Sequence, residues 1–140
     1  RLVGSEMCIR DRQPRGTTGY CHRIICAQDY SAVTAACMMV KREAFDKVGG
    51  LTEELAVAFN DIDFCLKVRK TGKLVVYDPY AEWFHYESKS RGYEDSPEKV
   101  ERFNDEVDTL LRSWREIIEQ GDPYYNPNLT LDNSDFSLRK

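Results

Sequence analysis

The feature that most constrains the fold is a long amphipathic helix predicted near the C-terminus. Ser96-Pro97-Glu98 is typical of a helix start, with a hydroxyl for the N-cap, proline at the first position and an acid that meets the helix dipole. Apolar residues then recur every three or four positions up to Gly121, namely Val100, Phe103, Val107, Leu110, Leu111, Trp114, Ile117 and Ile118. One apolar stripe of this kind is typical of a helix that packs against a core.

The chain is long enough for one core. With 140 residues and 41% apolar content, it is expected to form a single domain or part of one. Residues 1–19 show no helical or strand period, and residues 1–12 resemble a translated sequencing adaptor, so 1–19 are interpreted as a non-native or disordered leader. The start at Arg1 rather than methionine favours a fragment. The folded part is predicted over residues 20–121, followed by an irregular tail over 122–140.

Charge and hydropathy exclude two classes of function. A net charge of −4 without a basic run argues against nucleic acid as a partner. The longest apolar run, residues 35–40, is far shorter than the roughly 18 residues of a membrane span, so no transmembrane segment is expected. The five cysteines are odd in number, which favours a reducing, cytoplasmic location. The expected location is therefore the cytoplasm, with the inner face of the membrane as a variant. The spacing of Cys21, His22 and Cys26 does not match a zinc knuckle.

The remaining pattern predicts an α/β fold. The expected elements are an extended segment at 30–40, helices at 41–48 and 61–71, and strands at 73–77 and 81–86. Glycines end both helices, because glycine adopts the left-handed C-terminal conformation at little cost. In the tail, the candidate anchors are Tyr124, Tyr125, Leu129, Leu131 and Phe136.

Two acids open the second predicted helix. Asp61 and Asp63 are two residues apart, so on a helix they lie roughly 200° from each other and cannot share a face. Asp61 is expected in the exposed first turn, and Asp63 is better placed for structural hydrogen bonds to backbone amides. From spacing alone, Asn60 as N-cap and Asp61 as a dipole-favoured acid are preferred to a catalytic role.

A second polar group follows the predicted strand at 81–86. His85 stands at its end, where a neutral imidazole could bind a metal, although a lone histidine more often packs or forms hydrogen bonds. In the following loop, Ser88 offers a hydroxyl and Arg91 a planar guanidinium, both suited to phosphate oxygens. The alternative is a solvated surface arginine.

Together these segments resemble the C-terminal half of a bacterial family 2 glycosyltransferase of the rhamnosyltransferase type. The resemblance spans about residues 24 to 138 and rests on residues 31–45, 48–51, 60–66, 85–92 and 122–129. It implies the C-terminal part of a GT-A fold, with a mixed sheet, flanking helices, the long C-terminal helix and the tail. It also implies inverting transfer of a sugar from a nucleotide-diphosphate donor to a carbohydrate or lipid-linked acceptor, in cell-surface polysaccharide synthesis.

The resemblance gives roles to individual residues. Asp61 matches the catalytic base, which takes the proton of the acceptor hydroxyl. His85 matches a ligand of the divalent cation, Mn²⁺ or Mg²⁺, which neutralises charge on the departing diphosphate. Arg91 and Ser88 would contact the donor diphosphate. Asn60 replaces the usual glutamate before the base, which leaves an amide for substrate binding but removes a charge.

The sequence also departs from the complete family pattern. No nucleotide-binding βαβ unit and no metal-binding Asp-x-Asp at a strand end precede the matched segments. Asp61-Ile62-Asp63 has the letters of that motif but opens a helix, so it is rejected as the metal motif. These 140 residues are therefore expected to be inactive alone.

Two other functions stay open from the sequence. A metal-dependent hydrolase would use Asp61, His85 and Glu87 around an ion with bound water. A non-catalytic carbohydrate-binding or interaction module would use Tyr124 and Tyr125 as platforms, with the acids merely capping helices.

Overall fold

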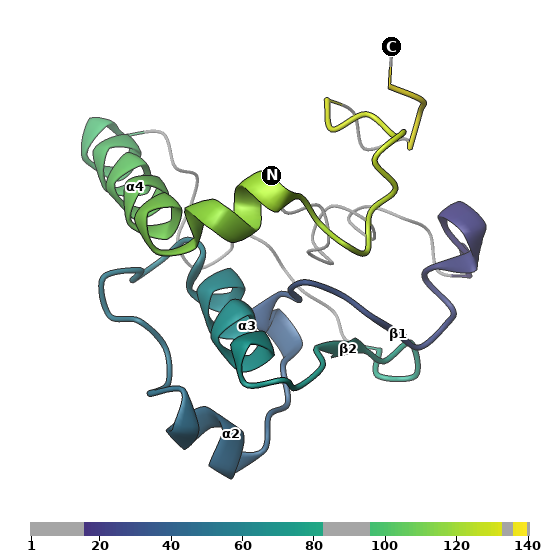
Figure 1. Ribbon diagram of the computed structural model, residues 1–140, viewed down its shortest axis with the longest axis horizontal. Coiled ribbons are helices and arrows are strands. Elements are labelled where there is room, and N and C mark those ends of the chain that lie inside the picture. Colours follow the sequence, from purple (N-terminus) through teal and green to yellow (C-terminus); the bar gives the residue numbers. More distant parts are fainter. Residues whose placement is uncertain (1–15, 83–95, 133–135, 140) are drawn as a thin grey trace.

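The computed structural model describes residues 16–82, 96–132 and 136–139. Its main helices are α2 (Arg42–Lys47), α3 (Asn60–Lys70) and α4 (Pro97–Gln120), and two short 3₁₀ turns, η1 (Tyr20–His22) and η2 (Ala35–Cys37), precede them in the chain. The strands β1 (Gln28–Asp29) and β2 (Val76–Tyr77) pair antiparallel, with Gln28 opposite Tyr77. Figure 1 shows α3 at the centre, with α4 on one side and the strands on the other. Over the described ranges, no helix is long and apolar enough to cross a membrane.

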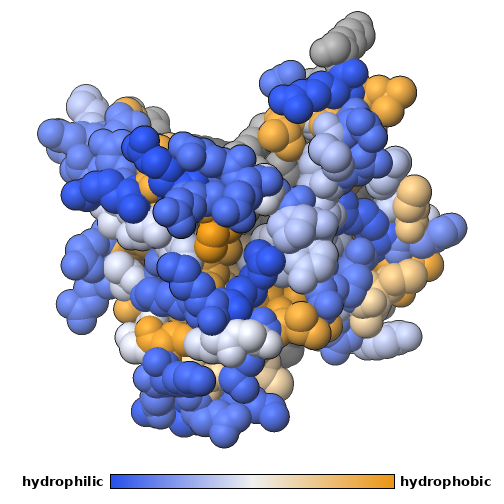
Figure 2. All heavy atoms as spheres, viewed as in Figure 1, coloured by the Kyte–Doolittle hydropathy of each residue, from blue (hydrophilic) through white to orange (hydrophobic). Residues whose placement is uncertain are grey.

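The prediction of α4 is confirmed. Ser96 is the N-cap and its Oγ accepts a hydrogen bond from the Lys99 amide, while Gly121 ends the helix at φ 84°. The buried residues of the helix are Glu106, Leu110 and Trp114. In Figure 2 the surface of α4 is mostly hydrophilic, and apolar atoms are visible between α4 and α3. The outer part of the predicted stripe, including Val100 and Phe103, is exposed.

The prediction of α2 and α3 is confirmed, including the glycines that follow their C-terminal ends. α2 stops before Gly49 and Gly50, and α3 before Gly72, each glycine having positive φ. Gly50 has φ 70°, and a Cβ there would lie 3.0 Å from the Phe45 ring, so conformation and space both favour glycine.

The extended segment predicted at 30–40 is wrong as a strand. Its middle is η2, and the strand lies just before it, at β1. The Thr34 side chain accepts a hydrogen bond from the Ala36 amide, and the Asp61 carboxylate accepts one from the Ala35 amide. Side chains therefore bind the backbone N–H groups that would have paired with a neighbouring strand in a sheet. The strand predicted at 73–77 shortens to β2, and that at 81–86 lies mostly outside the described residues. The structure is therefore α/β with a small two-stranded sheet.

The core lies on both sides of α3. On one side, Cys65 packs with Ala32 and Val75. On the other, Leu66 packs with Leu110 and Trp114 of α4. Burial raises the pKa of the Cys65 thiol to about 11, so it stays protonated and acts as a small apolar residue.

The tail has buried residues of its own and is bonded to the rest of the fold. Tyr125 and Leu129 are buried, and the Tyr125 hydroxyl donates to the Thr130 carbonyl at 2.7 Å. At the start of the tail, Asp122 Oδ1 accepts a hydrogen bond at 2.7 Å from the fully buried Ser31 hydroxyl. The prediction that Tyr125 and Leu129 anchor the tail is confirmed.

Candidate functional site

The candidate site is built at the first turn of α3. Phe59 is the N-cap, in the left-handed conformation at φ 63°, and no side chain caps the helix. Asn60 is therefore the first helical residue, and its predicted role as N-cap is wrong. The Phe59 carbonyl accepts the Asp63 amide at 2.9 Å, which begins the helical hydrogen-bond pattern. Both acids lie in the first turn, where the helix dipole favours negative charge.

The Asp61 carboxylate is held by two backbone amides. Oδ1 accepts a hydrogen bond from the Ile62 amide at 2.9 Å, and Oδ2 accepts one from the Ala35 amide at 3.1 Å. The side chain is half-buried. Each carboxylate oxygen has two acceptor positions, so each keeps one for a further donor. Asp61 is therefore oriented, reachable and able to accept a proton from a hydroxyl.

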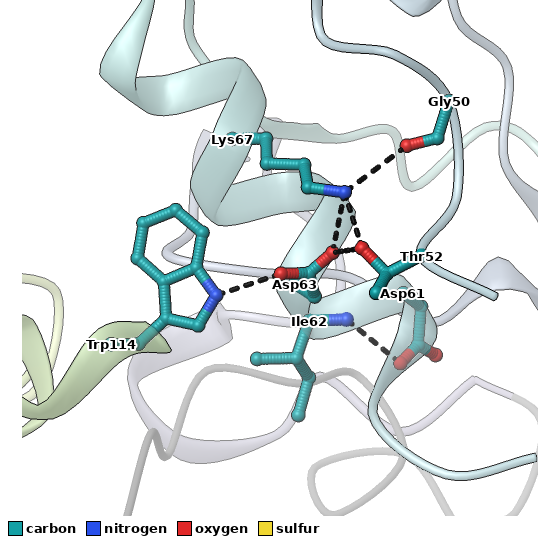
Figure 3. A network of polar contacts seen from close by, with 7 residues as sticks. All are labelled: Gly50, Thr52, Asp61, Ile62, Asp63, Lys67 and Trp114. Atoms are coloured by element: carbon teal, nitrogen blue, oxygen red, sulfur yellow. Dashed lines mark hydrogen bonds and ion pairs between the residues drawn. The ribbon is translucent and has the colours of Figure 1, made fainter. Parts of the chain in front are cut away.

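Asp63 is buried in a network that joins three parts of the chain (Figure 3). The Trp114 indole of α4 donates to Oδ1 at 2.8 Å, and the Thr52 hydroxyl donates to Oδ2 at 2.6 Å. The Lys67 ammonium lies 2.9 Å from Oδ2 and also reaches the Thr52 hydroxyl and the Gly50 carbonyl. The partners of Asp63 are thus side chains rather than the backbone amides that were predicted.

The protonation of Asp63 follows from this network. Burial by itself raises the pKa of the Asp63 carboxyl. The hydrogen bonds from Thr52, Lys67 and Trp114 and the positive charge of Lys67 act in the opposite direction and prevail, so the pKa lies below its usual value. Asp63 is a charged structural group near neutral pH, and its contacts in Figure 3 are separate from those of Asp61.

A third carboxylate, Glu106, was not identified from the sequence. It is only 2% exposed, and its two oxygens accept the amides of Val57 and Ala58 at 3.0 and 2.8 Å. A signal was present, because Glu106 stands four residues before Leu110 and eight before Trp114 and so shares their buried face. An acid on the apolar face of a helix needs a polar partner inside the fold.

Four of the sequence candidates lie outside the described residues: His85, Glu87, Ser88 and Arg91. Their roles stay predictions. Asn60 is described and half-buried beside Asp61. In the ranges that the structure describes, no group of three His, Cys, Asp or Glu side chains could hold a metal ion.

The two tyrosines that a carbohydrate-binding module would use, Tyr124 and Tyr125, have different environments. Tyr125 is 9% exposed and its hydroxyl is bonded to the Thr130 carbonyl, so its ring is not open to a sugar. The half-buried ring of Tyr124 lies under the Arg69 guanidinium, 5.4 Å from the ring centroid. Tyr125 is therefore not available as a platform for a sugar ring.

The chain is similar in sequence to several bacterial proteins. It is 56% identical over 126 residues, 89% of its length, to uncharacterized protein y4gI of Sinorhizobium fredii. It is 34% identical over 113 residues, 81% of its length, to O-antigen biosynthesis protein RfbC of Myxococcus xanthus. A 60-residue part, 43% of the chain, is 37% identical to N-acetylglucosaminyl-diphospho-decaprenol L-rhamnosyltransferase of Mycobacterium tuberculosis.

The chain spans a small part of each of these relatives. The matched regions are 14% of y4gI, 8% of RfbC and 20% of the rhamnosyltransferase. No protein-family model matches the chain. No solved structure matches it either.

Proposed function

We propose that this chain is part of an inverting glycosyltransferase with a GT-A fold, which moves a sugar from a nucleotide-diphosphate donor to an acceptor hydroxyl. The similarity to RfbC carries the proposal, because it covers 81% of the chain and so includes the middle, where Asp61 lies. The similarity to the rhamnosyltransferase supports the same class of reaction. By their names, these relatives favour a role in cell-surface polysaccharide synthesis with a carbohydrate or lipid-linked acceptor.

In this reaction Asp61 acts as the general base. Its carboxylate is held by the Ala35 and Ile62 amides with acceptor positions to spare. It takes the proton of the acceptor hydroxyl as that oxygen bonds to the anomeric carbon, while the bond from this carbon to the diphosphate oxygen breaks. The nucleoside diphosphate leaves with the electron pair of the broken bond, and a single displacement inverts the anomeric configuration.

The remaining site residues belong to the same proposal. Asn60 would bind the acceptor with its amide, and Ser88 and Arg91 would contact the donor diphosphate. His85 would help to hold a divalent cation, Mn²⁺ or Mg²⁺. Such an ion, when bound, stabilises negative charge on the departing diphosphate.

The test is release of nucleoside diphosphate from UDP-, GDP- and dTDP-sugars with Mn²⁺, by the complete gene product and by residues 1–140 alone. Asp61→Asn in the complete product should lower turnover roughly 100-fold or more while donor binding is kept, since an amide cannot accept the proton. Asp46→Asn, an exposed acid on α2, is the matched control and should leave turnover unchanged.

Two results would contradict this proposal. Unchanged turnover in Asp61→Asn would remove Asp61 as the base. Robust turnover by residues 1–140 alone would show that the donor site does not require further chain.

A further inference from the structure

Glu106 connects α4 to the segment that leads into the candidate site. Its carboxylate accepts both the Val57 and the Ala58 amides, at 3.0 and 2.8 Å. Such charge-assisted hydrogen bonds are shorter and stronger than neutral ones. A buried carboxylate bonded in this way fixes the backbone at residues 57–58 relative to α4.

This fixed backbone lies immediately before the bend that starts α3. Phe59 has φ 63°, a left-handed conformation that is unfavourable for a non-glycine residue, so the surrounding structure must hold it. On the α4 side, the Phe59 ring lies 5.3 Å from that of Phe103, between ring centroids. Glu106 and Phe103 therefore hold the bend from the same helix, and Asp61 follows it by two residues.

We propose that Glu106 is a positioning residue for Asp61. It sets the direction in which α3 begins, and thereby the distance from the Asp61 carboxylate to the Ala35 amide that orients it. This inference rests on the proposed function in taking Asp61 as the base. The effect of Glu106 on the geometry of Asp61 can, however, be measured without any turnover.

The structure supplies an internal control on the same helix face. Trp114, eight residues beyond Glu106, donates its indole N–H to Asp63. A change at Glu106 that acts only on the bend should leave this contact intact. A change that displaces α4 as a whole should disturb it.

The experiment compares Glu106→Gln with the native chain by amide NMR and hydrogen exchange. Glutamine is nearly the same size, but it has one carbonyl oxygen, and its NH₂ group opposes the second backbone N–H. Exchange of the Val57 and Ala58 amides should rise about tenfold, the equivalent of one hydrogen bond. The Ala35 amide resonance should shift, while that of the Trp114 indole should not. Glu116→Gln, an exposed acid on α4, should change none of these signals.

Activity gives a second readout in the complete gene product. Glu106→Gln should lower kcat by about 10-fold to 100-fold with little change in KM, as expected when a catalytic group is misplaced by about 1 Å. Glu106→Asp keeps the charge but withdraws it by one methylene, and should give a smaller shift of the Ala35 resonance in the same direction.

Three results would overturn the proposal. The first is an unshifted Ala35 amide in Glu106→Gln. The second is a Trp114 indole signal that shifts together with Ala35, because α4 would then have moved as a unit. The third is unfolding of both variants, which would assign Glu106 to overall stability. Full turnover in Asp61→Asn would instead contradict the role of Asp61, whatever the NMR shows.

Discussion

At the scale of single residues, three carboxylates around the start of α3 have different environments. Asp61 is half-buried and bonded to backbone amides, Asp63 is buried against a lysine and an indole, and Glu106 is buried against the two amides before the helix. The first keeps acceptor capacity for a substrate. The other two use their charge to join elements of the fold.

The Asp63 network is expected to stabilise the fold. Asp63→Asn removes the charge that pairs with Lys67 in a site where the Asp63 side chain is 5% exposed. We expect the free energy of unfolding to fall by about 2 kcal/mol, because buried donors lose a charged partner. The matched control is Asp46→Asn on α2. It breaks another i,i+4 ion pair, Arg42–Asp46, whose side chains are 86% and 54% exposed, and should cost less than about 0.5 kcal/mol.

The difference in the free energy of unfolding between the native chain and Asp63→Asn should depend on pH. The pKa of Asp63 is lowered in the folded state, so its charge stabilises the fold fully above the unfolded pKa of about 4. This contribution is lost as the pH falls through the lowered pKa. Urea titrations at pH 7 and in steps toward pH 3 should therefore show the native chain and Asp63→Asn converging. A difference that stays constant over this range would contradict the assignment.

At the scale of elements, α4 holds α3 through one face. The buried residues of this face, Glu106, Leu110 and Trp114, recur every four positions and contact the bend, the core and the Asp63 network in turn. α4 thus buries apolar side chains against α3 and forms two sets of hydrogen bonds, one through Glu106 and one through Trp114. The orientation of α3, and with it that of Asp61, depends on this face.

Two adjacent leucines test which face of α4 carries the packing. Leu110 is 8% exposed in the core beside Leu66, while Leu111 is 37% exposed. Leu110→Ala should lower the free energy of unfolding by about 3 kcal/mol, since it removes buried methyl groups and leaves a cavity. Leu111→Ala should cost less than about 1 kcal/mol. Equal losses in chemical denaturation would show that both faces of α4 are packed.

At the scale of the whole molecule, the tail joins the ends of the described chain. The Ser31 hydroxyl donates to Asp122 and accepts a hydrogen bond from Arg69 at 2.9 Å, which links the segment after β1, the end of α3 and the start of the tail. Further along, the Phe136 ring stacks on that of Tyr20, with centroids 4.6 Å apart. The tail is therefore part of the fold.

Two adjacent tyrosines test the anchoring of the tail. The buried Tyr125 hydroxyl donates to the Thr130 carbonyl at 2.7 Å. Tyr125→Phe should lower the free energy of unfolding by about 1 kcal/mol and speed proteolysis within the tail, because that carbonyl loses its donor. Tyr124→Phe, at the half-buried neighbour, should change stability by less than about 0.5 kcal/mol. If the two variants behave alike, the Tyr125 hydroxyl does not anchor the tail.

Features that depend on local chemistry follow from the sequence alone. The N-cap at Ser96 and the glycines after α2, α3 and α4 act within a few residues of the chain, so they predict the start of α4 and the C-terminal ends of the three helices correctly. The two-residue spacing of Asp61 and Asp63 is likewise enough to separate them, because helical geometry turns them to different faces. The resemblance that assigned Asp61 as the base also rests on motifs along the chain.

The tertiary structure alone decided how distant groups meet. The η2 turn forms where a strand is expected, because the carboxylate of Asp61, 26 residues away, accepts a hydrogen bond from the Ala35 amide. Asp63 finds its indole partner 51 residues away, and Glu106 binds amides 48 and 49 residues before it. A buried polar group must find a partner wherever the fold brings one, and sequence spacing does not specify which one that is. The orientation of Asp61 therefore follows from contacts that only the packed chain creates.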